Sequence, residues 1–235
     1  MCPIFPPLPT AVAYACVAAS PLDQNYLDQN YLDTQQLHPE ERKLLPASAN
    51  LRYASSFVAG RIAAHEALRK LGVDDNAPIL RGERGMPIWP DGICGSLTHK
   101  RGLAAAIVAR ADEYAAVGID LEVNPAPRHS RFALSICTSE ERRWLSEYGG
   151  NRDEMLLAIF SAKESIFKAL YPICKRYFGF HSAELHWDDT RELFNGALLD
   201  DLHPQLGRGF QLEICISRCD DLLLSHLLLP IDRLP

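Results

Sequence analysis

Apolar side chains occupy every second position in the segment VGIDLEV, within residues 115–124. A period of two is typical of a strand, so we expect an extended segment here. Asp120 and Glu122 are two residues apart, and both carboxylates must therefore project from the same face of that strand. Two adjacent like charges cost energy unless they lie in water, share a proton or are neutralised by a cation.

Apolar residues spaced three and four positions apart predict a helix over residues 55–72, where a basic last turn is followed by Gly72. The other predicted elements, in chain order, are a strand after the Pro-rich start, a Gly- and Pro-rich loop over 81–92, a buried strand or short helix late in 92–110, a short helix over 139–146, a long helix over about 153–170, and strands over about 211–217 and 222–229. Helices and strands mix without regular alternation, which favours an α+β fold over a doubly wound sheet. The repeat LDQNYLDQNYLD, residues 22–33, has a period of five, and we interpret it as a duplication within a loop.

Composition narrows the class of protein. The chain has 235 residues, of which 47% are hydrophobic and 23% charged, as in a globular protein. Its apolar runs are shorter than the roughly 20 residues of a membrane-spanning helix, so we expect no membrane span. Seven cysteines without a CxxC pair argue against a disulfide framework or a zinc site. No basic residue precedes Arg42, which argues against a signal peptide, and we expect a cytoplasmic protein.

The charge is unevenly distributed along the chain. The net charge is −6, yet residues 42–110 carry eleven Lys and Arg against five acidic residues. That segment is therefore at +6 and the remainder at −12. One interpretation is an anion bound by the first part and a metal or a basic partner bound by the second; the alternative is solvated basic helix faces. A sequence pI of about 5.7 and the lack of basic runs with interleaved aromatics argue against nucleic-acid binding.

The predicted long helix offers a third carboxylate. Lys163 stands in its apolar stripe, Glu164 follows, and Lys168 lies one turn beyond Glu164. One interpretation is a lysine that extends along the surface, beside an exposed ion pair. The other is that Glu164 joins Asp120 and Glu122 in a site for a hard cation such as Mg²⁺.

These motifs together resemble a known family. VGIDLE (117–122), followed by FSAKESIFKALYP (160–172), resembles the signature of the surfactin-type 4'-phosphopantetheinyl transferases. The upstream stretches FVAGR and RGERGMPIWPDGICGSLTH are similar to the branch that contains enterobactin synthetase component D. The resemblance runs from about Leu37 to Leu185. Thr98 stands where many relatives have Ser, and Phe160 replaces the commoner Trp.

The resemblance implies a fold of two similar α/β halves related by a pseudo-twofold axis, with coenzyme A bound between them. Residues 1–113 would form the half that binds its phosphates and adenine, and residues 114–235 the half with the metal and the carrier-protein contact. The implied metal ligands are Asp120, Glu122 and Glu164. The implied catalytic residues are Glu164, as general base, with Lys163 and Lys168. The implied coenzyme A-binding residues are Arg52, Arg61, Arg84, Gly85, Met86, Pro87, Ser96, Thr98, His99, Lys100, Asp120, Lys163 and Lys168.

The activity that the resemblance implies is transfer of the 4'-phosphopantetheine arm of coenzyme A to a serine hydroxyl of an apo acyl or peptidyl carrier protein. Adenosine 3',5'-bisphosphate would be released, with Mg²⁺, or alternatively Mn²⁺, as the cofactor. We expect a monomer that serves nonribosomal peptide or siderophore synthesis and contacts the carrier through residues 124–141. Two alternatives stay open: another metal-dependent phosphoryl-transfer or phosphodiester-cleaving enzyme, and a non-catalytic carrier-binding subunit of a synthetase complex. The second alternative predicts lost carboxylates or lysines, and this sequence retains them.

Overall fold

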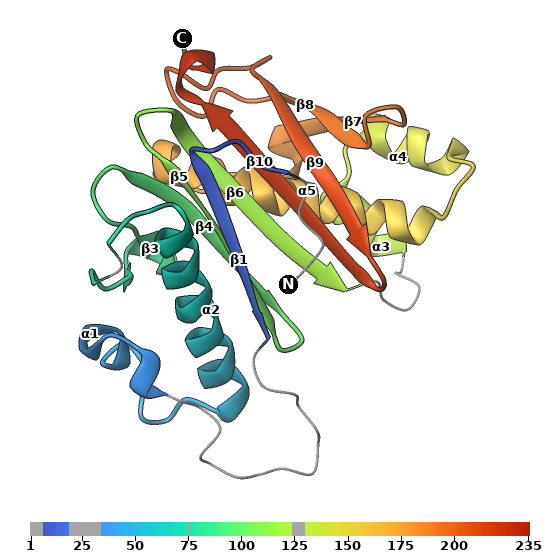
Figure 1. Cartoon of the computed structure of the whole chain (residues 1–235). Coiled ribbons are helices and arrows are strands. Elements are labelled where there is room, and N and C mark those ends of the chain that lie inside the picture. The colour runs from blue at the N-terminus through green and yellow to red at the C-terminus, as the bar shows by residue number, and fades with distance from the viewer. Residues whose placement is uncertain (1–6, 19–33, 75, 124–129) are drawn as a thin grey trace.

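The computed structural model describes residues 7–18, 34–74, 76–123 and 130–235, and its elements form two halves (Figure 1). The first half comprises β1 (Val12–Ala18), α1 (Pro39–Arg42), α2 (Leu51–Lys70), β2 (Leu80–Arg81), β3 (Pro87–Ile88), β4 (Ile93–Lys100) and β5 (Leu103–Arg110). The second half comprises β6 (Tyr114–Val123), α3 (Ser130–Ile136), α4 (Ser139–Glu147), α5 (Arg152–Cys174), β7 (Ala183–Asp188), β8 (Leu193–Leu198), β9 (Gln211–Cys219) and β10 (Leu222–Pro230). The 22–33 repeat and positions 124–129 of the expected carrier contact lie outside the described residues.

Each half is a long helix packed on an antiparallel sheet. Strands β1, β5 and β4 form a three-stranded sheet in the order β1-β5-β4, which α2 covers. The larger sheet has the order β6-β10-β9-β8-β7 and packs against α5. The predicted α+β class with two similar halves is therefore confirmed. The chain passes from the smaller sheet to the larger one between Arg110 and Tyr114. That residues 1–113 bind coenzyme A and residues 114–235 bind the metal and the carrier stays a prediction.

Most predicted elements are present, with shifted ends. Helix α2 begins at Leu51, earlier than predicted, because the Asn50 side chain caps it by accepting a hydrogen bond from Tyr53 N at 2.8 Å. The ambiguous segment late in 92–110 is strand β5, which is almost entirely buried. Strands β7 and β8 were not predicted, because their short alternation is broken by the polar turn around Asp188. Within the described part of the chain, no helix has both the length and the apolarity needed to cross a membrane.

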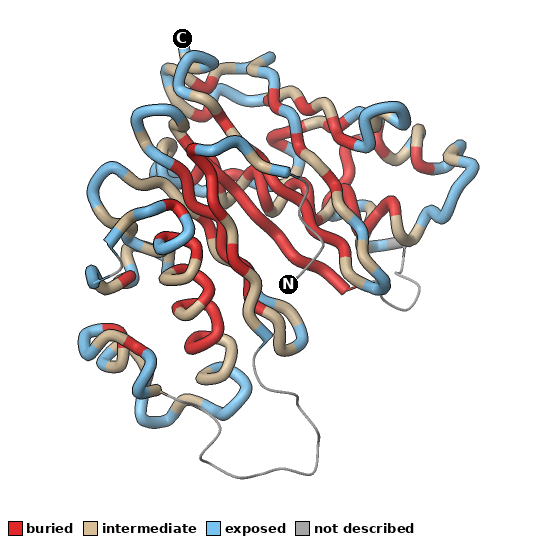
Figure 2. Tube along the Cα trace, viewed as in Figure 1, coloured by how far each residue is buried: buried red, intermediate tan, exposed pale blue. Residues whose placement is uncertain are grey.

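The two sheets meet along β4 and β6, a contact that we call the seam. Ser96 Oγ accepts a hydrogen bond from Ile119 N at 3.2 Å, and Thr98 Oγ1 accepts one from Leu121 N at 3.1 Å. Both partners advance by two residues, so the strands run parallel at the seam and hydroxyl groups bond where a carbonyl would in a sheet. An apolar cluster that combines residues of β5, β6 and β10 is buried behind this contact. Figure 2 shows the resulting continuous band of buried residues from β5 to β10.

Gly118 allows α5 to approach β6 unusually closely. A Cβ atom at this position would lie 2.0 Å from the Ser165 carbonyl oxygen and 3.0 Å from the Ala169 Cβ. Only glycine leaves room for this contact between a helix backbone and a strand. The same contact brings the α5 side chains Ser161 and Lys168 onto Asp120, two residues further along β6.

We expect Gly118→Ala to lower the free energy of unfolding by about 1–3 kcal/mol or more, because the added methyl group overlaps a helix carbonyl that cannot move alone. Urea denaturation would measure the change. Gly149→Ala is the matched control, since nothing lies within 4 Å of a Cβ at that position, and it should stay within about 0.5 kcal/mol of the wild type. Equal stabilities of the two variants would contradict the close approach.

Candidate functional site

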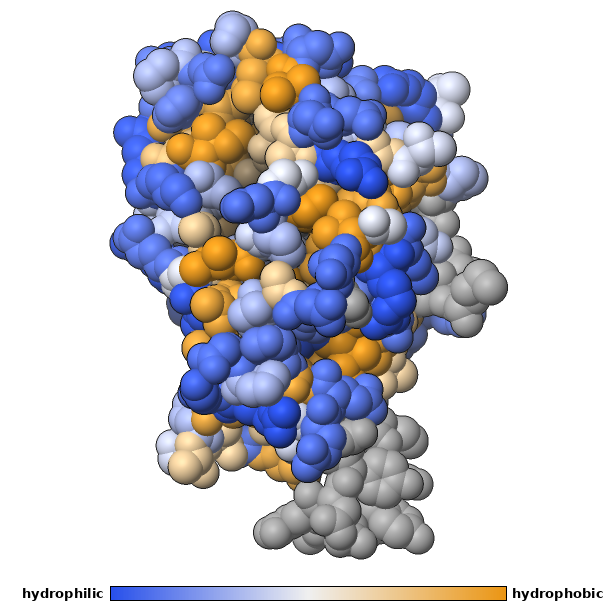
Figure 3. All heavy atoms as spheres, turned by 60° about the vertical axis from the view of Figure 1, so that its left-hand side comes forward, coloured by the Kyte–Doolittle hydropathy of each residue, from blue (hydrophilic) through white to orange (hydrophobic). Residues whose placement is uncertain are grey.

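A cavity of about 570 Å³ lies between the two halves. Its walls come from α2, the β2–β3 segment, β4, the start of β6 and α5. Nine of the residues predicted to bind coenzyme A line it: Arg61, Arg84, Gly85, Met86, Pro87, Ser96, Thr98, His99 and Lys168. The face turned forward in Figure 3 shows hydrophobic side chains gathered in several places among hydrophilic ones. A large cavity with apolar walls and a few convergent charged groups is typical of a ligand-binding site.

Four other predicted coenzyme A-binding residues are not among the cavity-lining residues. Arg52 is exposed in the first turn of α2. Lys100 ends β4 and directs its ammonium to Glu122 instead. Asp120 is buried beside Lys168, and Lys163 lies in the core of the second half. Arg52 and Lys100 stay predictions, because the described contacts connect neither with the cavity.

The carboxylates of Asp120 and Glu122 are only 6% and 4% exposed, so water does not separate their charges. Asp120 Oδ1 accepts from Lys168 Nζ at 2.7 Å and from Thr98 Oγ1 at 3.3 Å, while Oδ2 accepts from Ser161 Oγ at 2.9 Å. Glu122 Oε1 accepts from Lys100 Nζ at 2.7 Å. In the structure, two lysines from two different elements therefore neutralise the pair on the strand.

Glu164 of α5 is electrostatically coupled to Asp120 and Glu122, and we call these three residues the acidic cluster. Burial raises the pKa of the Glu164 carboxyl, and Asp120 and Glu122 raise it further, whereas Lys168 and Lys100 lower it. These mutual effects indicate that the three carboxylates share one electrostatic environment. Burial also lowers the pKa of His99, and the adjacent Lys168 lowers it further, so this cavity-lining imidazole favours its neutral form.

The acidic cluster suits a divalent cation in chemistry but not in its present arrangement. Among the described residues, no three His, Cys, Asp or Glu side chains are grouped as a metal would require. Two of the three carboxylates are paired with lysines, Asp120 with Lys168 and Glu122 with Lys100. Oxygen donors of this kind are the ligands that Mg²⁺ prefers. A bound ion would take over part of the neutralisation that Lys100 and Lys168 now provide.

Lys163 occupies a different place from the one predicted for a catalytic or coenzyme A-binding residue. Its side chain is buried, and Nζ donates to Glu141 Oε2 at 2.7 Å and to the Ile136 carbonyl at 2.9 Å. Burial lowers the pKa of Lys163, and the Glu141 carboxylate opposes that effect. It lines a second cavity, of about 110 Å³, which Glu164 also lines. These contacts connect α5 with α3 and α4 rather than with a ligand.

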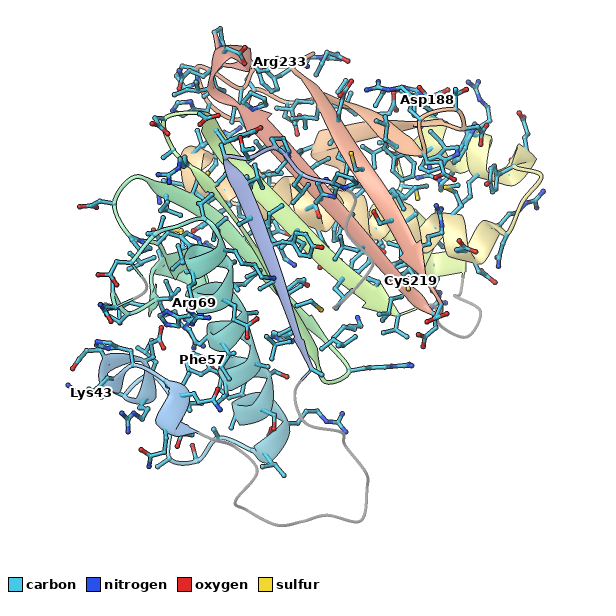
Figure 4. The ribbon with its side chains drawn as sticks, in the orientation of Figure 1. Lys43, Phe57, Arg69, Asp188, Cys219 and Arg233 are labelled. Carbon is cyan, nitrogen blue, oxygen red and sulfur yellow. The ribbon has the colours of Figure 1, made fainter. Side chains whose placement is uncertain are left out.

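Three aromatic and basic residues of the cavity wall were missed from the sequence. Arg81 Nη2 donates to the Tyr53 hydroxyl at 2.7 Å, and the Arg81 guanidinium lies 5.6 Å from the centre of the Phe57 ring. Arg61 lies over the same ring at 4.7 Å. Figure 4 labels Phe57 on the side of α2 that faces α1. Spacing contained the signal, because Tyr53, Phe57 and Arg61 are four residues apart and share one helix face.

Trp89, also missed, forms another part of this wall. Its ring packs on Gly95 of β4, where a Cβ atom would lie 2.5 Å from ring atom Cε2. The glycine therefore lets a large aromatic ring lie directly against the strand backbone. The Gly-Ser pair of GICGS thus shapes the cavity with its first residue and the seam with its second.

The fold and site define a two-half protein with a basic cavity wall and a buried acidic cluster beside it. Two family models match the chain: the 4'-phosphopantetheinyl transferase N-terminal domain over residues 40–109, and the 4'-phosphopantetheinyl transferase superfamily over residues 116–215. The chain therefore belongs to the 4'-phosphopantetheinyl transferase superfamily.

Individual relatives agree with this assignment. The chain is 39% identical over 165 residues to the 4'-phosphopantetheinyl transferase Svp of Streptomyces mobaraensis. The matched residues make up 69% of this chain and 66% of Svp. The chain is 38% identical over 151 residues to PptT of Mycobacterium tuberculosis, covering 64% and 65%. Enterobactin synthase component D of Salmonella typhi is 37% identical over 123 residues, covering 52% and 50%. The chain thus spans slightly less than two thirds of the length of Svp and PptT.

We expect Lys163→Met to lower the free energy of unfolding by about 3–5 kcal/mol, because it leaves the buried Glu141 carboxylate without its ammonium partner. Lys43→Met is the matched control, since it breaks an exposed lysine–glutamate pair and should cost less than about 1 kcal/mol. Chemical denaturation of both variants is the measurement. A Lys163→Met protein as stable as the control would return Lys163 to the group of ligand-binding candidates.

Proposed function

We propose that the protein transfers the 4'-phosphopantetheine arm of coenzyme A to a serine hydroxyl of an apo carrier protein and releases adenosine 3',5'-bisphosphate. The observation that carries this proposal is the ion pair between Lys168 and Asp120. Lys168 lines the cavity, whereas Asp120 belongs to the acidic cluster. A single contact therefore joins a site suited to a phosphorylated ligand with a site suited to phosphoryl chemistry.

The basic residues of the cavity wall fit the phosphates of coenzyme A. Arg61, Arg81 and Arg84 all line the cavity, and a guanidinium can bind a phosphate through two parallel hydrogen bonds. His99 and Lys168 lie on the opposite part of the lining, on β4 and α5. The aromatic residues Tyr53 and Trp89 of the same cavity offer surfaces on which an adenine ring can stack.

Asp120, Glu122 and Glu164 would hold Mg²⁺, with Mn²⁺ as the alternative. When bound, such an ion supplies positive charge to the pyrophosphate at the moment of bond cleavage. The chain itself contributes Lys168, whose ammonium is already within 2.7 Å of Asp120 Oδ1. In this proposal the Lys168 ammonium would meet the negative charge that develops on the leaving group.

Glu164 is the candidate general base. A serine hydroxyl is a poor nucleophile at neutral pH and needs a base within roughly 2.6–3.2 Å or through one water molecule. The raised pKa of Glu164 makes its carboxylate a better proton acceptor than an exposed glutamate. Glu164 lines the smaller cavity and is electrostatically coupled to Asp120 and Glu122, which supports a role in proton transfer near the bound metal.

A carrier protein is the expected partner. Helix α3, within the 124–141 segment, presents Leu134 with 57% of its surface exposed, which suits the partly apolar face of a carrier helix. One relative is named as a component of enterobactin synthase, which supports nonribosomal peptide or siderophore synthesis as the pathway class. The lack of a CxxC pair among the seven cysteines suits a reducing cytoplasm. A monomer remains our expectation.

Mass spectrometry of an apo carrier domain, incubated with the protein, coenzyme A and Mg²⁺, should show the carrier heavier by one phosphopantetheine. A carrier whose acceptor serine is replaced by alanine should stay unmodified. Asp120→Asn should abolish the transfer because it removes one charge from the acidic cluster, and Asp112→Asn, an exposed control, should not. Coenzyme A cleavage without a carrier would instead indicate a phosphodiesterase, and carrier binding without transfer a non-catalytic subunit.

Lys168→Ala should lower kcat roughly 10²–10³-fold while raising the KM for coenzyme A much less, because a contact that strengthens in the transition state acts mainly on the chemical step. Steady-state kinetics on coenzyme A would measure both constants. Lys70→Ala is the control, since Lys70 is exposed at the end of α2. Its ammonium donates a hydrogen bond to the Tyr14 carbonyl and does not line the cavity. Retention of more than about a third of the wild-type kcat would remove Lys168 from the catalytic residues.

A further inference from the structure

A short motif occurs once in each half, in front of the long helix. HPEER (38–42) opens α1, and TSEER (138–142) opens α4. Both form a capping box. The side chain of the residue before the helix accepts a hydrogen bond from a backbone N–H of the first turn, and the glutamate three residues later accepts one from the backbone N–H of the residue before the helix. The glutamates are Glu41 and Glu141, which are 0% and 2% exposed. A capping glutamate normally lies at the surface, so its complete burial calls for another role.

Glu41 holds three separate segments of the first half together. Its Oε1 accepts from Ile79 N at 2.8 Å and pairs with His65 Nε2 at 2.9 Å, and its Oε2 accepts from His38 N at 3.2 Å. Burial raises the pKa of Glu41, but the hydrogen bonds from His65 and Ile79 lower it by more, so the carboxyl stays ionised. A fixed negative charge therefore lies inside the first half, behind the cavity wall.

The nearest guanidinium to that charge is Arg61. Its Nε lies 4.0 Å from Glu41 Oε1 and has no hydrogen-bond partner among the described residues. Arg61 is only 5% exposed, and Arg81 repels its charge. Burial lowers the pKa of Arg61, and Glu41 acts in the opposite direction. At 4.0 Å the carboxylate compensates the charge of Arg61 without a direct hydrogen bond to its Nε.

The second half repeats this arrangement. Glu141 accepts from Leu185 N at 2.7 Å and Thr138 N at 2.7 Å, and it pairs with Lys163 of α5. In both halves the glutamate thus joins a short helix, a backbone N–H in or next to a strand, and a basic residue of the long helix. The halves differ in how the basic residue meets the glutamate. Lys163 donates to Glu141 at 2.7 Å, whereas the Arg61 Nε stays 4.0 Å from Glu41 and Arg61 also lines the cavity.

We propose that Glu41 is a positioning residue for coenzyme A binding, which holds the Arg61 guanidinium in place in the cavity wall. This inference rests on the proposed function and extends it. Glu41 itself does not line the cavity, so it acts on the ligand through Arg61. A glutamate with a purely structural role would hold α1 in place without any influence on the affinity for a phosphorylated ligand.

Glu41→Gln tests the proposal, because it removes the charge and keeps the shape. Glu40→Gln is the matched control: it is the same substitution one residue earlier, at an exposed surface pair. We expect calorimetry with coenzyme A to show a dissociation constant raised roughly 10- to 100-fold in Glu41→Gln, the range for groups that orient a binding residue, and an unchanged value in the control. The KM for coenzyme A should rise similarly, while kcat changes less than about twofold.

A double-mutant cycle separates positioning from loss of stability. If Glu41 acts through Arg61, Glu41→Gln should cost no further affinity in an Arg61→Ala background. Additive losses would overturn the proposal. Glu41→Asp keeps the charge and should bind coenzyme A more tightly than Glu41→Gln, even where thermal melts show it to be no more stable. Equal affinities of these two variants, or failure of both to fold, would also overturn it in favour of a structural role.

The wild type keeps this test distinct from that of the proposed function. If the wild type and Glu40→Gln fail to bind coenzyme A, the proposed function is wrong, and this inference falls with it. If both bind coenzyme A and Glu41→Gln binds it equally well, only the positioning role is wrong.

Discussion

The hydroxyl groups of Ser96 and Thr98 hold the two halves of the molecule in register. Each accepts a backbone N–H of β6, so β4 and β6 lie side by side without a continuous backbone ladder. The cavity and the acidic cluster both depend on this contact, because the cavity takes its walls from the two halves and Thr98 also donates to Asp120. A serine or threonine can do this because one hydroxyl both accepts and donates. The seam therefore holds the two halves together and also forms part of the cavity wall.

Electrostatic compensation at the seam explains why two carboxylates can be buried on one strand. Lys100 comes from the first half and pairs with Glu122, while Lys168 comes from α5 and pairs with Asp120. Removing one partner of such a buried pair leaves an uncompensated charge, so the four residues stabilise the structure only as a set. Arg61 and Glu41 follow the same rule at the other end of the cavity, but their wider spacing leaves the cation available to a ligand.

The sequence predicted the parts of this site whose spacing is regular. The period of two in β6 placed Asp120 and Glu122 on one face of the strand. The helical period placed Glu164 and Lys168, four residues apart, one turn from each other on α5. What spacing could not provide was the direction of each side chain in space. The family resemblance implied that Lys163 binds coenzyme A, yet its ammonium bonds to Glu141, twenty-two residues earlier in the chain. Arg81 and Glu41 were missed for the same reason, because their partners are distant in sequence.

The seam also decides which sheet edges meet the solvent. In the described part of the chain, β4 and β6 are terminal strands of their sheets, and each covers the other. An uncovered strand edge is a template for pairing with other chains, and β6 is buried along most of its length. Separation of the halves would expose two such edges at once, and each could pair with another chain. Loss of two hydroxyl groups would therefore threaten the colloidal stability of the protein as well as its catalytic geometry.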